Sequence, residues 1–266
     1  MGFFEDLAAR IDSRDTMVCV GLDPDPDRLP EDVRDAELPR WQFNRRIIDA
    51  THECAACYKP NAAFYEGADG WRALAETIAY AHGKDVPVIL DAKRGDIGNT
   101  ARQYASALDR ADAITVNPYM GRDSLQPFLS REEKGIFALC RTSNPGGKDF
   151  QNLELASYDE YLYEHVARRM AEWDEHGNVG LVVGATRPEE LERVREIAPD
   201  LPFLVPGVGA QGGDVEAAVE HGRTAAGVGV VNSTRGIIFA GEEREDWDRA
   251  AGAAAKRLRD RLNEYR

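Results

Sequence analysis

The sequence predicts an α/β protein built as a single (β/α)8 barrel of the TIM type. Short runs rich in β-branched residues alternate with amphipathic segments along the whole chain, which indicates parallel strands connected by helices. Eight such strand and helix pairs can be counted, the number that closes a barrel. Because barrels of this type run to about 250 residues, we expect residues 1–266 to form one domain.

The expected strands are short apolar runs, several of which end in polar residues. They cover residues 17–22, 55–60, 86–92, 113–117, 135–141, 179–183, 203–206 and 225–230. An open doubly wound sheet would show the same alternation. The polar strand ends favour the barrel, because in a barrel they can face one shared mouth.

Apolar residues recurring with helical spacing predict the helices between these strands. They cover residues 71–82, 100–108, 158–173, 188–197, 214–220 and 245–262. Two further segments, 23–40 after the first strand and 142–152 after the fifth, have the composition of long loops. Loops of this length in a compact domain are usually functional or disordered.

The overall charge limits the kinds of partner. A formal net charge of −14 argues against nucleic acid or an anionic membrane surface as a ligand. The chain contains no run of about 18 apolar residues and no secretory signal, and its four cysteines are scattered. We therefore expect a cytoplasmic protein. The acidic, lysine-poor composition is also typical of adaptation to salt, although GC-rich coding would favour arginine as well.

The third expected strand runs directly into three charged residues, Asp91, Lys93 and Asp96. Side chains alternate along a strand, so Asp91 and Lys93 should point to the same face, at the mouth of the barrel. A buried structural ion pair would explain the same residues. The alternative reading is a catalytic charge cluster.

A glycine-rich turn, residues 207–212, follows the seventh strand and matches G-x-G-x-x-G. A dinucleotide-binding fold would place this turn early in the chain, with an acidic residue about 20 positions later, and here that neighbourhood reads VVNSTRG. Barrels commonly bind phosphate between the loops after strands seven and eight, where backbone amides are exposed. Residues 207–212 match that position; otherwise the glycines form only a tight turn, and Arg235, after the eighth strand, is a surface charge.

Several motifs together resemble one family. DAKRGDIGNT, at residues 91–100, resembles the D-x-K-x-x-D-I signature of the orotidine 5'-monophosphate decarboxylases. The resemblance extends to GLDP (21–24), YKPNAAFYE (58–66), TSNPGG (142–147), PGVGAQGGD (206–214) and NSTRGI (232–237). It implies decarboxylation of orotidine 5'-monophosphate to UMP in pyrimidine biosynthesis, with no metal or organic cofactor. The residues of the K-P-N-x-A-F and N-S-x-R-G-I motifs most resemble a branch of the family that is better known in bacteria.

The resemblance also implies roles for individual residues. The catalytic charges would form an alternating array in which Lys93 protonates the carbanion, and a homodimer would bring Asp96 and Thr100 into the partner's site. The four residues of the array are Lys59, Asp91, Lys93 and Asp96. Among the expected substrate contacts, Asp23 would bind the ribose, Ser143 the pyrimidine edge and Arg235 the phosphate. Gln211 would bridge phosphate and pyrimidine. Pro206 and Gly209 would contact the substrate from the loop after strand seven.

Two other functions are compatible with parts of this pattern. A magnesium-dependent hexulose-phosphate aldolase or keto-gulonate-phosphate decarboxylase resembles the chain in the D-x-K-x-x-D strand, but would be expected to carry a metal-binding carboxylate where Lys59 stands. A non-catalytic phosphate-binding barrel would need the charges to be purely structural. Cys54 and Cys57 form C-x-x-C without a second pair, and the triplet beginning at Asn232 matches a glycosylation acceptor without a secretory signal; neither is expected to be functional.

Overall fold

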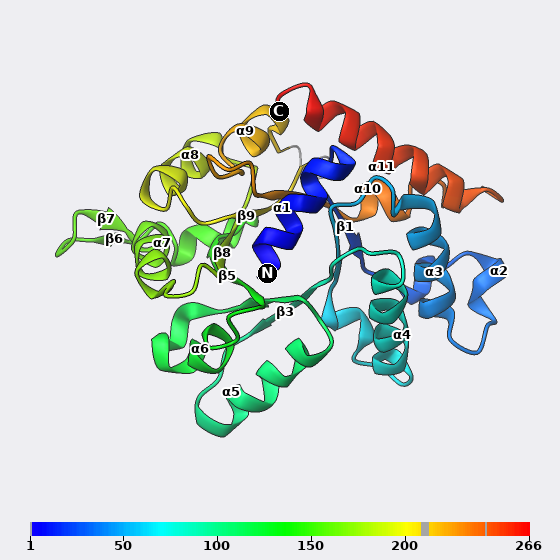
Figure 1. Ribbon diagram of the computed structural model, residues 1–266, viewed down its shortest axis with the longest axis horizontal. Coiled ribbons are helices and arrows are strands. Elements are labelled where there is room, and N and C mark those ends of the chain that lie inside the picture. Colours follow the sequence, from blue (N-terminus) through cyan, green and yellow to red (C-terminus); the bar gives the residue numbers. More distant parts are fainter. Residues whose placement is uncertain (1, 209–212, 243) are drawn as a thin grey trace.

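The computed structural model describes residues 2–208, 213–242 and 244–266, and these form a parallel barrel surrounded by helices (Figure 1). The eight-stranded sheet has the order β2-β1-β10-β9-β8-β5-β4-β3, and each neighbouring pair in that order is parallel. The strands are β1 (Val18–Leu22), β2 (Cys57–Pro60), β3 (Ile89–Arg94), β4 (Ala113–Val116), β5 (Gly135–Arg141), β8 (Val179–Val183), β9 (Phe203–Pro206) and β10 (Val230–Ser233). The predicted (β/α)8 TIM barrel is confirmed.

The barrel closes where β2 meets β3, and this closure is looser than the other strand pairings. Two isolated bridges join the strands, Tyr58 with Val88 and Asn61 with Asp91. The Tyr58 amide also donates a hydrogen bond to the Pro87 carbonyl at 2.9 Å. We call this junction the β2–β3 seam.

Helices surround the barrel, and one of them, α1, lies across its end (Figure 1). They are α1 (Phe3–Arg14), α2 (Glu31–Arg34), α3 (Pro39–Thr51), α4 (Gly70–His82), α5 (Gly98–Ala105), α6 (Arg122–Leu129), α7 (Leu162–Trp173), α8 (Pro188–Ile197), α9 (Val215–Glu220), α10 (Arg235–Ile238) and α11 (Trp247–Asn263). A short hairpin, β6 (Glu154–Leu155) with β7 (Glu160–Tyr161), projects beside α7. Among the described residues, no helix is both long and apolar enough to cross a membrane.

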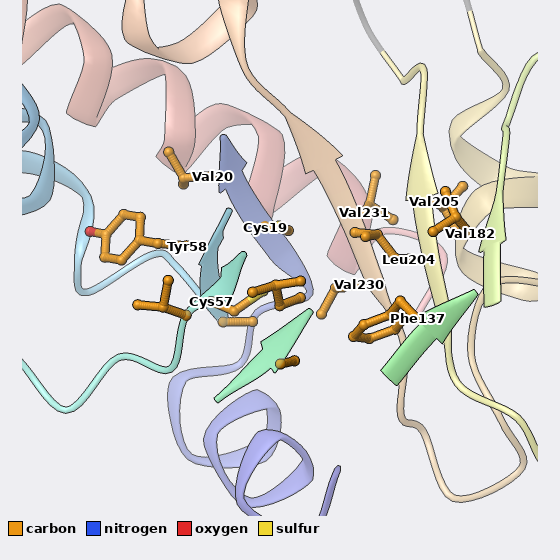
Figure 2. Close-up of a cluster of buried hydrophobic side chains, with 14 of the residues drawn as sticks. Cys19, Val20, Cys57, Tyr58, Phe137, Val182, Leu204, Val205, Val230 and Val231 are labelled. Atoms are coloured by element: carbon orange, nitrogen blue, oxygen red, sulfur yellow. The ribbon is translucent and has the colours of Figure 1, made fainter. Parts of the chain in front are cut away.

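The strands carry an apolar core, and α1 covers one end of it. Figure 2 shows Cys19, Cys57, Phe137 and Val230 among the side chains buried on the strands. Phe3 of α1 packs edge-to-face against Phe137, and a Cβ on Gly135, the first residue of β5, would lie 2.3 Å from the Phe3 ring. Glycine at this position therefore lets α1 lie against the amino ends of the strands. The carboxyl ends are left to form the functional mouth, as is usual in such barrels.

Seven of the eight predicted strands are confirmed, but the eighth was placed too early. Residues 225–230 were expected to form it, whereas β10 spans Val230–Ser233. The earlier residues form a turn in which Gly227 has φ +81°, and a Cβ on Gly229 would lie 2.2 Å from the Gly222 carbonyl oxygen. The polar residues at the end of β10 hid the true strand, because a strand that ends at the open mouth of a barrel does not need to be apolar throughout.

The predicted loops contain more regular structure than expected. Segment 23–40 includes a 3-10 turn, η1 (Pro26–Arg28), the short helix α2 and the first residues of α3. The helix expected over 158–173 begins only at α7's Leu162, because the preceding residues form the β6–β7 hairpin. Helices α1, α2, α3, α6 and α10 were not predicted. The prolines of segment 23–40 favoured a loop in the sequence, yet proline is well tolerated in the first turn of a helix, as Pro39 shows in α3.

Candidate active site

A cluster of opposite charges lies at the carboxyl ends of β2, β3 and β4. Asp91 on β3 accepts hydrogen bonds from the ammonium groups of Lys59 (2.8 Å, to Oδ2) and Lys93 (2.6 Å, to Oδ1). The hydroxyl of Thr115 on β4 donates a third bond to Asp91 Oδ1, at 2.8 Å. The carboxylate is therefore held on both of its oxygens, and it lies between two cations.

Burial and charge act in opposite directions on this cluster. Burial alone would raise the pKa of Asp91, but the ammonium groups of Lys59 and Lys93 outweigh it and hold the pKa far below its ordinary value. Burial alone would lower the pKa of Lys59, but the carboxylates of Asp91 and Asp23 raise it well above the usual range. Asp91 and Lys59 are thus fixed in their charged forms near neutral pH.

Lys93 lies at an irregular point of β3. Its backbone has φ +48°, in the left-handed region that residues other than glycine rarely adopt, and the pairing of β3 with β4 shifts register between Leu90 and Arg94. The Lys93 amide donates to the Thr115 hydroxyl at 2.9 Å, which ties down this conformation. The Lys93 side chain is 47% exposed while that of Asp91 is 9% exposed. Asp91 therefore fixes an ammonium group that still reaches the open mouth.

A cavity of about 370 Å³ opens at the carboxyl ends of β1, β9 and β10. Three of the predicted substrate-binding residues, Asp23, Pro206 and Arg235, line it. Burial raises the pKa of Asp23, with the Lys59 ammonium opposing the effect. Asp23 Oδ1 is buried and has no hydrogen-bond partner among the residues that the structure describes. Such an oxygen can accept a bond from a hydroxyl group of a ligand.

Arg235 follows β10 and is the first residue of α10. The segment before it packs closely on β1, because a Cβ on Gly21 would lie only 1.9 Å from the Thr234 hydroxyl oxygen. Glycine at position 21 thus allows the end of β10 to approach β1. This packing brings Arg235 to the same cavity as Asp23, which follows β1.

Other predicted residues lie elsewhere or cannot be placed. Asp96 accepts a hydrogen bond from the Ile97 amide (2.8 Å) and forms no ion pair within the described parts of the chain. Thr100 is exposed on α5. Ser143 lines a separate cavity of about 450 Å³, between the loops after β5 and β8. Gly209 and Gln211 lie outside the described residues.

Two residues of the site escaped the sequence analysis. Thr115 contacts both Asp91 and the Lys93 backbone, and its only signal was a polar residue within an apolar strand. Asn232 lines the cavity and is 9% exposed, with Cys19 Sγ donating to its side-chain oxygen at 3.5 Å. The sequence did not indicate that Asn232 lines the cavity. Asn232 stands in an apparent glycosylation triplet, and the predicted eighth strand ended before it, at residue 230.

Fold and site together define the class of the protein: a (β/α)8-barrel enzyme. Its lysine–aspartate cluster lies beside a cavity that is lined by Arg235. Residues 16–250 match the model of the orotidine 5'-phosphate decarboxylase / HUMPS family. The chain belongs to this family.

Individual relatives agree with the family over the whole chain. An orotidine 5'-phosphate decarboxylase of Halobacterium salinarum is 70% identical, and one of Halorubrum lacusprofundi is 73% identical; each alignment covers 100% of both chains. Among solved structures, an OMP decarboxylase of Leishmania donovani has a TM-score of 0.85 and 45% identity, over 100% of this chain and 99% of that one.

Proposed function

We propose that this protein is an orotidine 5'-monophosphate decarboxylase, a carboxy-lyase that forms UMP and carbon dioxide in pyrimidine biosynthesis. The observation that carries the proposal is Asp91, which is buried between two lysines at the mouth of the barrel. Family membership and the full-length relatives of that name support the same activity.

The proposed chemistry needs a fixed cation at one ring carbon. When the bond to the carboxylate breaks, its electron pair stays on that carbon and carbon dioxide leaves. The Lys93 ammonium would stabilise the developing negative charge and then transfer a proton to the carbon, leaving a neutral amine that water reprotonates. Asp91, itself held by Lys59 and Thr115, directs the ammonium before the reaction begins, which is electrostatic preorganisation.

The substrate would span the charge cluster and the 370 Å³ cavity. Arg235 would bind the phosphate, Asp23 Oδ1 would accept a bond from a ribose hydroxyl, and Pro206 would line the site. For Gly209, Gln211 and Ser143 the family resemblance supports contacts to phosphate and pyrimidine. Ser143 would have to approach from its separate cavity, so its loop would close over the substrate.

We further propose that the working unit is a cytoplasmic homodimer of one-domain chains, in which Asp96 and Thr100 contribute to the partner's site. Large apolar side chains are exposed near these residues: Ile97 (56%), Tyr119 (86%) and Met120 (46%). They follow β3 and β4, beside the charge cluster. A second copy covering this surface would bury them and bring its Asp96 towards Lys93.

The metal-dependent phosphosugar reactions are not favoured. Lys59 occupies the end of β2, where those enzymes would be expected to carry a metal-binding carboxylate, and its ammonium would repel Mg²⁺. The deciding experiment follows ultraviolet absorbance while purified protein is incubated with orotidine 5'-monophosphate, with and without EDTA. We expect the same decarboxylation rate in both samples. Absence of turnover would contradict the proposed activity, and loss of turnover in EDTA would favour the metal-dependent class.

A further inference from the structure

A second arginine, Arg28, borders the same cavity as Arg235. Arg28 ends η1, on the segment that follows β1, and its guanidinium carbon lies 3.9 Å from the centre of the Phe239 ring. Phe239 also lines the cavity. Among the described lining residues, Arg28 and Arg235 are the two cationic side chains. The sequence analysis assigned no role to Arg28.

Glu242 fixes the orientation of the Arg28 guanidinium. Arg28 Nε donates to Glu242 Oε1 at 2.7 Å, and Nη2 donates to Oε2 at 2.5 Å. This bidentate pair uses the side of the guanidinium that carries Nε. Because a guanidinium has five N–H donors, Nη1 and the second hydrogen of Nη2 remain, and neither has an acceptor within the described residues. The pair thus presents a second bidentate edge.

The charges around the cavity call for more than one cation. Asp23 and Asp25 line it together with the two arginines. A phosphate monoester brings a charge of about −1.5 to −2 near neutral pH. Arg235 alone would leave much of that charge uncompensated next to two carboxylates. The free edge of Arg28 matches two phosphate oxygens in geometry as well as in charge.

We propose that Arg28 is a second phosphate-binding residue, which makes the site selective for the nucleotide over the nucleoside, and that Glu242 orients it. The inference rests on the proposed function, because the phosphate belongs to the substrate or product of that reaction. Arg28 contacts the phosphate through Nη1 and Nη2. Glu242 holds the opposite edge of the guanidinium, and its negative charge weakens the attraction between Arg28 and the phosphate.

The test compares the dissociation constants of UMP and of uridine, measured by titration calorimetry with competition where binding is weak. Arg28→Met should weaken UMP binding by roughly ten- to hundredfold, the usual range for a lost charge-assisted pair, and leave uridine binding within about twofold. Arg28→Lys should fall between, because the charge remains while the fork is lost. Arg235→Ala serves as the positive control and should show the same dependence on phosphate.

Glu242→Gln separates this role from a structural one. It keeps an oxygen that can accept from Arg28 but removes the competing charge, so UMP binding should tighten, by about threefold, while Arg28→Met weakens it. If the ion pair only ties segment 23–40 to the segment after α10, Glu242→Gln and Arg28→Met should change UMP binding in the same direction. They should also change uridine binding as much as UMP binding. Either result would overturn the proposal.

Arg131→Met is the matched control for loss of an ion pair. Arg131 pairs with Asp109 at 2.8 Å and its side chain is 35% exposed, compared with 33% for Arg28, but it precedes β5 on the amino side of the barrel. The Arg131→Met variant should bind UMP as tightly as the wild type does. If the wild-type protein is active and Arg28→Met binds UMP as tightly as the wild type does, only the proposed role of Arg28 is refuted. A wild-type protein that neither binds UMP nor decarboxylates its precursor would refute the proposed function as well.

Discussion

Asp91 determines how the other charges of the site are held. It accepts from Lys59 on one oxygen and from Lys93 and Thr115 on the other, so each partner is oriented by the same carboxylate. Removing the water shell from the buried charges of Asp91 and Lys59 is costly, and their mutual pairing offsets that cost. The half-exposed Lys93 is the member that can meet a substrate.

The first prediction concerns Lys93. Lys93→Ala should abolish measurable turnover while the dissociation constant of UMP changes by less than about tenfold, because the ammonium acts mainly on charge that develops in the transition state. Steady-state kinetics and calorimetry measure the two effects. Lys84→Ala, which removes a partly exposed lysine paired with Asp49, is the control and should retain full activity. Equal losses of binding and turnover would argue against Lys93 as the proton donor.

The second prediction uses the raised pKa of Asp23. Burial favours the protonated form in the folded state, so the carboxyl group contributes stability below its unfolded pKa of about 3.9 and loses that contribution as pH rises. Near pH 7 the charged group therefore costs stability. Asp23→Asn should raise Tm at pH 7 and weaken UMP binding, since the asparagine no longer offers a carboxylate to a ribose hydroxyl.

The pH dependence provides the check on Asp23. The difference in Tm between Asp23→Asn and wild type should shrink as the pH is lowered towards the unfolded pKa of about 3.9, because the raised pKa lets the folded wild-type carboxyl take up its proton above that pH. Thermal unfolding followed by circular dichroism at both pH values measures it. A Tm that falls at pH 7 would show that Asp23 stabilises the fold in its charged form.

Residue-level prediction from the sequence succeeded where the local pattern was sufficient. Asp91 and Lys93 were expected on one face from strand alternation, and they do meet, although β3 is irregular at Lys93. Thr115 and Asn232 reach the site only through strand neighbours distant in the chain, and no spacing in the sequence encodes that proximity.

At the scale of elements, strands buried on both faces were the easiest to predict. β8 and β5 match their predicted ranges because apolar runs of this length have few alternatives in a parallel barrel. β10 was misplaced because its last residues are polar and serve the cavity. Helix α3 was missed because it begins at a proline inside a segment rich in charge, and its amphipathic pattern is weak.

The loop after β5 is fastened to α8 by one buried ion pair. Arg141, the last residue of β5, places Nε 2.7 Å from Glu190 Oε2, and its Nη1 donates to Gln151 at 3.0 Å. The side chains of Arg141 and Glu190 are 3% and 12% exposed. Ser143 follows two residues later, so this pair anchors the base of the loop proposed to close over the substrate.

The third prediction tests that anchor. Glu190→Met should lower the free energy of unfolding by about 3–5 kcal/mol, because it leaves the buried Arg141 cation without its partner. The double variant with Arg141→Met should recover much of the loss, since no buried charge remains. Urea unfolding measures both, and Arg131→Met, at an exposed pair, should change stability by less than about 1 kcal/mol. A single variant no worse than this control would show that the Arg141 pair is not important.

At the scale of the whole molecule, the fourth prediction concerns the proposed shared sites. Lys93→Ala and Asp96→Asn should each be inactive as homodimers. When the two proteins are unfolded together and refolded at equal concentration, about half of the dimers should be mixed. In each mixed dimer one site collects both substitutions and the other has neither. About a quarter of all sites should therefore regain wild-type activity.

The absence of recovery is equally informative. If Lys93 and Asp96 serve the same chain's site, every site in a mixed dimer keeps one substitution and activity does not return. Native mass spectrometry establishes that mixed dimers have formed. Inactive mixed dimers would therefore place Asp96 in the site of its own chain.

The β2–β3 seam links the proposed catalytic charges to the stability of the barrel. The bridge between Asn61 and Asp91 and the bond from Lys59 to Asp91 both cross it. Because the pKa of Asp91 is depressed, its stabilising effect is present above about pH 3.9 and disappears as acid protonates it in the folded state. Protonation of Asp91 should thus weaken the barrel at this seam, because the charges that are proposed to carry the reaction also hold β2 against β3.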